Sequence, residues 1–92
     1  MSLKESQVDK MWNKLGFTVT HASDHVRAVL EVDGRVIART KRSHGRGKLD
    51  GRVPELIRQQ MRLSSPQFKL AVDCPLQRDQ YLIILRDKGE LT

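Results

Sequence analysis

Apolar residues recur every three to four positions near the start of the chain, in the segment SLKESQVDKMWNKLGF. This spacing places them on one side of a helix and predicts an amphipathic helix that packs into a core. The recurring residues are Val8, Met11, Trp12 and Leu15. Ser2 and Glu5 have the spacing of a capping box at the start of this helix, and Gly16 suits its end.

From Phe17 the pattern changes to alternation. The runs FTVTHA, HVRAVLEV and RVIART each alternate apolar and polar residues, which is typical of strands with one buried face. Asp33–Gly34 separates the last two runs, and this dipeptide is a strong signal for a tight hairpin. We therefore expect three short antiparallel strands, with helices covering one face of the sheet.

A further helix is predicted for GRVPELIRQQMRL, because Pro54 suits a first helical turn and an apolar stripe accompanies it. The stripe consists of Val53, Leu56, Ile57, Gln60 and Met61, and the residues expected off it are Arg52, Arg58 and Arg62.

The tail predicts one or two short helices. Ser65 before Pro66 marks the start of the first, and Cys74–Pro75 marks its end. The run YLIIL fits either a buried strand or a second tail helix, and its flanking residues favour the helix. The expected fold class is α+β: a helix, a three-stranded antiparallel sheet, a helix and a helical tail. With 92 residues, we expect residues 1–92 to form a single domain.

Composition narrows the class of protein. Apolar residues make up 38% of the chain and charged residues 30%, which indicates a globular rather than a disordered protein. No apolar run is long enough to cross a bilayer and the first residues do not resemble a signal peptide, so we expect a cytoplasmic protein. Cys74 is the only cysteine, which excludes an internal disulfide.

Charge suggests a polyanionic partner. The chain has 17 Lys and Arg against 11 Asp and Glu, a net charge of +6. Six of the basic residues lie in RTKRSHGRGKLDGR, which contains three glycines and no apolar periodicity, and this segment predicts an exposed basic loop. Its residues expected to contact RNA phosphates are Arg39, Lys41, Arg42, Arg46 and Lys48. A loop that is merely solvated is the alternative.

Candidate catalytic groups are few. Recognised nucleophile, phosphate-loop and metalloprotease motifs are absent from the sequence. His21 and His25 are four residues apart, a spacing that brings two metal ligands together only on a helix, so we expect neither a metal nor another cofactor. His25 stands at a strand start near the basic loop. A histidine can take a proton from an RNA 2′-hydroxyl near neutral pH, although a lone histidine is more often structural.

The order of several motifs resembles a known family. These motifs are a helix ending in KLGF, the strand start ASDHVRAVL, the DGR turn, a His-bearing basic loop and GKLDGRVPELIRQQMRLS. Over about residues 5 to 68 the chain is similar to the HicA toxins of bacterial and archaeal toxin–antitoxin systems, in which the strand start carries Gly-Ser-x-His.

The resemblance implies a fold like that of double-stranded-RNA-binding domains and an mRNA interferase that needs no metal. It places the catalytic histidine at His25, preceded by Ser23 and Asp24, and a possible helper at His44. It also implies a HicB-like antitoxin as a protein partner. Residues 1–64 would form the family core, and residues 65–92 a helical extension packed on it.

One departure concerns Ala22, which stands at the usual glycine position and bears on whether the chain is active. Two other functions remain open: an RNA-binding module of the same fold without catalysis, and a protein-interaction domain whose basic face docks an acidic partner.

Overall fold

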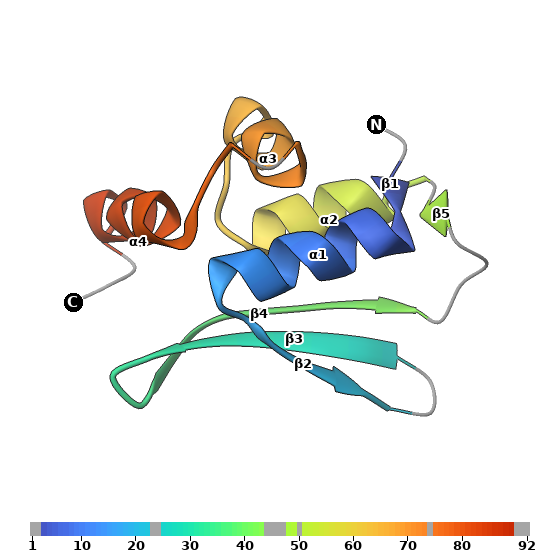
Figure 1. Ribbon diagram of the computed structural model, residues 1–92, viewed down its shortest axis with the longest axis horizontal. Helices are drawn as coiled ribbons and strands as arrows, with labels where there is room; N and C mark the ends of the chain where they lie inside the picture. Colours follow the sequence, from blue (N-terminus) through green and yellow to red (C-terminus); the bar gives the residue numbers. More distant parts are fainter. Residues whose placement is uncertain (1–2, 23–24, 44–47, 50, 74, 90–92) are drawn as a thin grey trace.

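The computed structural model describes residues 3–22, 25–43, 48–49, 51–73 and 75–89 (Figure 1). The described elements are β1 (Leu3–Lys4), α1 (Glu5–Leu15), β2 (Thr18–His21), β3 (His25–Val32), β4 (Arg35–Ser43), β5 (Lys48–Leu49), α2 (Val53–Gln60), α3 (Ser65–Val72) and α4 (Arg78–Asp87). The predicted α+β class and its order of helix, three-stranded sheet and helices are confirmed. None of the described helices has the length and apolar character needed to span a membrane.

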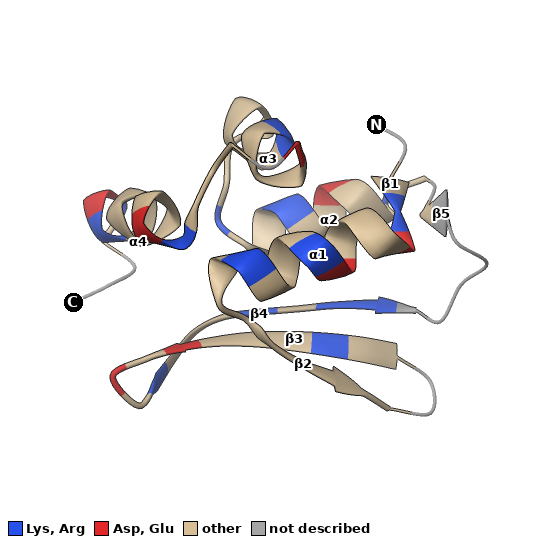
Figure 2. Cartoon of the chain, viewed as in Figure 1, with Lys and Arg blue, Asp and Glu red and all other residues tan. Residues whose placement is uncertain are grey.

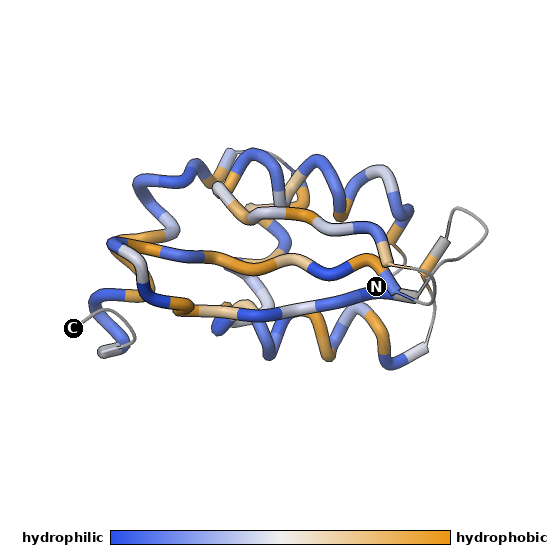
Figure 3. Tube along the Cα trace, turned by 90° about the horizontal axis from the view of Figure 1, so that it is seen from below, coloured by the Kyte–Doolittle hydropathy of each residue, from blue (hydrophilic) through white to orange (hydrophobic). Residues whose placement is uncertain are grey.

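The main sheet has the order β2-β3-β4, and both pairs are antiparallel. Asp33 and Gly34 join β3 to β4 with positive φ angles of 54° and 81°, as a tight hairpin turn requires, so the predicted hairpin is confirmed. The four helices lie on one side of this sheet, and its other face is uncovered (Figures 1 and 3). A second, two-stranded sheet pairs β1 with β5, which the apolar pattern had not predicted.

The predicted core face of α1 is confirmed, because its four recurring apolar residues are all buried. Gly16 ends the helix with a φ of 91°. The predicted capping box at Ser2 and Glu5 is wrong: Glu5 is already helical, and the Lys4 backbone N–H donates to Gln7 Oε1 at 2.9 Å. The N-cap is thus Lys4, two residues later than the sequence pattern indicated.

The predicted basic loop is partly a strand. Residues 39–43 belong to β4, which stays paired with β3 as far as Ser43 opposite His25. Apolar residues stop at Ala38 and the predicted strand RVIART ended at Thr40, so alternation did not indicate the last three residues of β4, 41–43. Residues 44–47 and residue 50 lie outside the described residues.

On α2, Pro54 lies at the start as predicted, and Ile57 and Met61 at its end are buried. Leu56 is 51% exposed, so its assignment to the buried stripe was wrong. The buried side of the helix is therefore narrower than the apolar spacing suggested.

The two tail helices share the core of the first sixty residues. Phe68 on α3 and Tyr81 and Leu85 on α4 are buried in the same cluster as Trp12. The ring of Tyr81 stacks on Phe17 with centroids 5.9 Å apart. The helical alternative for YLIIL is thus confirmed.

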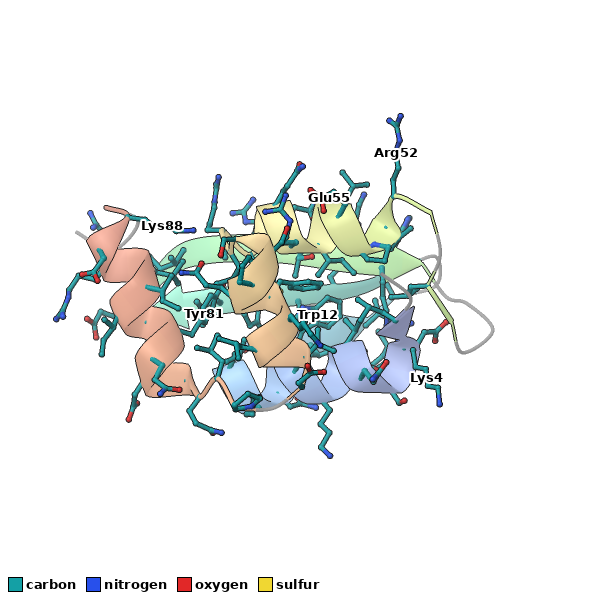
Figure 4. The ribbon with its side chains drawn as sticks, turned by 90° about the horizontal axis from the view of Figure 1, so that it is seen from above. Lys4, Trp12, Arg52, Glu55, Tyr81 and Lys88 are labelled. Atoms are coloured by element: carbon teal, nitrogen blue, oxygen red, sulfur yellow. The ribbon has the colours of Figure 1, made fainter. Side chains whose placement is uncertain are left out.

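Side chains also cap the end of α2. Three successive carbonyl oxygens there, of Met61, Arg62 and Leu63, accept hydrogen bonds from Tyr81 Oη at 2.8 Å, Lys88 Nζ and Arg58 Nη1 at 2.7 Å respectively. Figure 4 shows Tyr81 and Lys88 projecting from α4 on this side of the molecule. A helix end leaves such carbonyls unpaired. The bonds from Tyr81 and Lys88 therefore fix the tail to the end of α2, whereas the bond from Arg58 is made by α2 itself.

Candidate functional site

The uncovered face of the sheet is defined by strand alternation. Val26, Ala28 and Leu30 on β3 are buried against the helices, so the intervening residues of β3 belong to the opposite face. Two transverse rows follow from the register on that face. The rows are Thr20, Arg27 and Lys41, and Thr18, Val29 and Arg39.

Three cations gather on this face, and we call Arg27, Arg39 and Lys41 the cation cluster. All three are exposed, and Arg27 lies directly opposite Lys41. Figure 2 shows basic positions on both β3 and β4. Like charges directly opposite each other across strands destabilise a sheet. No carboxylate in the described part of the chain pairs with these three side chains. The arrangement favours a bound anion.

A groove of about 580 Å³ runs beside this cluster. Its lining includes all three cations, together with Thr40 and Gln60. Thr40 is 4% exposed and pairs with the buried Ala28, which places it on the helix side of β4. The groove therefore joins the charged face to polar groups near α2.

His25 lines a smaller pocket of about 140 Å³. The other residues around it are Lys41, Arg42, Val53, Leu56 and Gln60. Lys41 and Gln60 line both cavities, so the histidine pocket lies next to the cation groove. A titratable imidazole and a lysine ammonium share one small space, which is suited to a phosphodiester.

His25 is the first residue of β3 and is half-buried. Its carbonyl oxygen accepts a hydrogen bond from the Ala22 backbone N–H at 2.9 Å, which closes the turn between β2 and β3. Among the described residues, no side chain forms a hydrogen bond to its imidazole. The turn thus fixes the backbone at His25, while the ring is not oriented by a described partner.

Arg42 has a different position from its neighbours on β4. Its side chain is 5% exposed and faces α1. Nε and Nη2 donate to the two carboxylate oxygens of Asp9 at 3.0 and 2.9 Å, and Nη1 donates to Glu5 Oε1 at 2.9 Å. The prediction that Arg42 contacts RNA therefore needs correction: strand alternation turns it inward, and its guanidinium binds these carboxylates.

Several predicted site residues lie outside the described residues: Ser23, Asp24, His44 and Arg46. Lys48 lies in β5, and its side chain is also outside the description. His21 is exposed on the edge strand β2. Within the described ranges, no group of three or more His, Cys, Asp and Glu side chains could hold a metal ion.

Every Trp, Tyr and Phe side chain of the protein is buried. Trp12, Phe17, Phe68 and Tyr81 are the complete set, and each has an exposed fraction of 5% or less. Proteins that grip single strands through their bases stack those bases on exposed aromatic rings. The uncovered sheet face therefore offers no Trp, Tyr or Phe ring for base stacking, and its exposed cations favour contacts to phosphates.

Three residues of the site were missed by the sequence reasoning. Arg27 lies within a predicted strand, where alternation from Val26 would have placed it on the open face. Alternation from Ala38 would likewise have placed Thr40 on the inward face, and Gln60 was expected on the apolar stripe of its helix. That the two line one groove depends on how α2 packs on β4.

Comparison of the chain with protein-family models, with curated proteins and with solved structures finds no match. The resemblance to HicA toxins therefore stays a prediction.

Proposed function

We propose that the chain is a metal-independent endoribonuclease, the toxin of a HicA/HicB-type system, with His25 as its general acid/base. In this proposal it is a cytoplasmic protein that cuts mRNA and is held inactive by a HicB-like antitoxin. The observation that carries the proposal is the pocket shared by His25 and Lys41, next to the cation cluster. The motif order of the sequence supports the same function.

The proposed reaction uses the 2′-hydroxyl of the RNA as nucleophile. His25 takes its proton, the 2′-oxygen forms a bond to phosphorus, and the bond from phosphorus to the 5′-oxygen breaks. The leaving 5′-oxygen takes a proton from water or from the protonated imidazole. Lys41 stabilises the charge that develops on the phosphoryl oxygens. The products are a 2′,3′-cyclic phosphate and a 5′-hydroxyl.

Cleavage of a mixed RNA substrate in EDTA tests this reaction. His25→Ala should slow cleavage about 10²- to 10⁴-fold, the usual contribution of a positioned acid or base. The matched control is His21→Ala, because His21 is exposed and lines none of the cavities described above. Equal loss in both variants, or product ends other than those above, would contradict the proposed role of His25.

A second candidate is an RNA-binding module of the same fold that performs no chemistry. It is favoured by the absence, within the described residues, of a hydrogen-bonded partner that would orient the imidazole of His25. Under this alternative the wild-type protein binds RNA in EDTA and leaves it intact.

Both candidates require the cation cluster to bind phosphates. Arg27→Gln combined with Lys41→Gln should weaken RNA binding at low salt about tenfold or more, because two phosphate contacts are lost. Lys10→Gln combined with Arg86→Gln removes the same charge from exposed positions on α1 and α4. If this control pair weakens binding equally, net charge rather than the sheet face attracts the RNA.

A further inference from the structure

Two buried polar atoms beside the groove have no hydrogen-bond partner within the described residues. They are Thr40 Oγ1 and Gln60 Oε1. Both residues line the groove that holds the cation cluster. Trp12 Nε1 is also unpaired, but it lies in the core and does not line that groove.

Unpaired polar atoms destabilise a folded protein, and their presence in a native structure calls for a ligand or a water that pairs with them. Their position narrows the choice of ligand. Thr40 comes from the helix side of β4, and Gln60 is the last residue of α2, which packs on β4. Gln60 also lines the pocket of His25, so a group bound there lies next to both the cation groove and the imidazole pocket.

We propose that Thr40 and Gln60 form a polar slot that binds a ribose 2′-hydroxyl and thereby selects RNA over DNA. A hydroxyl matches this pair chemically, because it can donate to Gln60 Oε1 while it accepts from the Thr40 hydroxyl once the two side chains turn from their buried positions toward the groove. The cation cluster binds phosphates, which RNA and DNA share, so it cannot supply this selection. The 2′-hydroxyl is the group that distinguishes the two at a given site.

The bound hydroxyl belongs to a nucleotide that flanks the scissile one. In the proposed reaction the scissile 2′-hydroxyl gives its proton to His25, so it cannot also donate to Gln60 Oε1. This inference rests on the proposed function, because the ligand it assumes is a strand of RNA along β4. A measurement of RNA binding is enough to test it, and no cleavage is needed.

The experiment measures dissociation constants for an RNA and a DNA oligonucleotide of the same sequence, by fluorescence anisotropy. All proteins carry His25→Ala, so that the RNA stays intact. Thr40→Val and Gln60→Met remove the polar atoms with little change in shape. Each should weaken RNA binding about three- to tenfold, the effect of one lost hydrogen bond, and leave DNA binding unchanged. Gln59→Met is the matched control, because this neighbour is exposed and bonds to Glu55.

Melting temperatures of the same proteins separate binding from folding. Loss of an unpaired buried atom should leave each variant at least as stable as its parent, so a selective loss of RNA binding cannot be attributed to unfolding. The slot is refuted if RNA and DNA affinities fall together or if neither changes. A wild-type protein that prefers RNA but does not cut it would refute the nuclease and leave the slot standing.

Discussion

The buried guanidinium of Arg42 gives a prediction of stability. Three hydrogen bonds from this guanidinium tie β4 to the first two turns of α1, where Glu5 and Asp9 stand one helical turn apart. Arg42→Met fits the space of the aliphatic stem but leaves two carboxylates facing an apolar chain. Removing one partner of a fully buried ion pair costs about 3–5 kcal/mol.

The carboxylates reduce this cost because they are not fully buried. Glu5 is 17% and Asp9 31% exposed, so both can regain water after the substitution. We therefore expect a loss of about 2–3 kcal/mol in the free energy of unfolding, below the fully buried range. For a domain of this size, such a loss lowers Tm by roughly 8–24 °C.

Chemical denaturation, read by circular dichroism, measures the effect. Lys41→Met is the matched control: it removes a cation from the next residue, which points to the open face, and should change stability by less than about 0.5 kcal/mol. Adding Glu5→Gln and Asp9→Asn to Arg42→Met should restore part of the loss, because the uncompensated charges disappear. A loss that these neutral substitutions do not relieve would refute an electrostatic origin.

Two further predictions concern local features of the fold. Gly16→Ala should lower the free energy of unfolding by about 1–2 kcal/mol, because the φ of 91° at this position disfavours any side chain. The new Cβ would also lie 2.5 Å from Arg78 Nε, but the flexible Arg78 side chain can move away. Gly34→Ala, with a positive φ and open space, isolates the conformational part, and equal losses at both sites would show that Arg78 adds nothing. Burial raises the pKa of Tyr81, so the folded protein favours its neutral form. This preference stabilises the fold fully below the ordinary tyrosine pKa of about 10, and the stabilisation is lost as the pH rises above that value. Tyr81→Phe should lower stability at pH 7 by about 1 kcal/mol but show a smaller further loss in alkaline denaturation titrations; a parallel alkaline loss in both proteins would contradict this.

Helix periodicity and turn chemistry were sufficient to predict most of the architecture. The apolar stripe of α1, the Asp33–Gly34 turn and the Ser–Pro start of α3 are local signals, and the structure confirms each of them. The end of β4 is different. Its inward position is taken by Arg42, whose charge is compensated by carboxylates more than thirty residues earlier, and no local pattern contains that information.

The same limit applies to the candidate site. His25, Arg39 and Lys41 could be chosen from residue type and position near a basic segment. Thr40 and Gln60 could not, because a polar residue facing inward becomes significant only when the packing of α2 on β4 is known. The sequence thus indicates His25, Arg39 and Lys41, and the structure adds Arg27 and the neutral part of the site.

Strand alternation also limits how the basic segment can bind RNA. Counting charges along residues 39–43 suggests three cations, but Arg42 is directed to α1 and Arg27 enters the set from β3. The cation cluster can thus neutralise about three phosphates. Each contact contributes about −0.7 to −0.9 to the slope of log K, the logarithm of the binding constant, against log salt concentration, so the cluster gives a slope of about −2 to −3. Arg42→Gln should therefore leave this slope unchanged in protein that is still folded, whereas Arg39→Gln should reduce it by nearly one. A slope much steeper than −3 in the wild-type protein would assign further phosphate contacts to basic residues outside the cluster, and a slope that falls on loss of Arg42 would contradict its structural role.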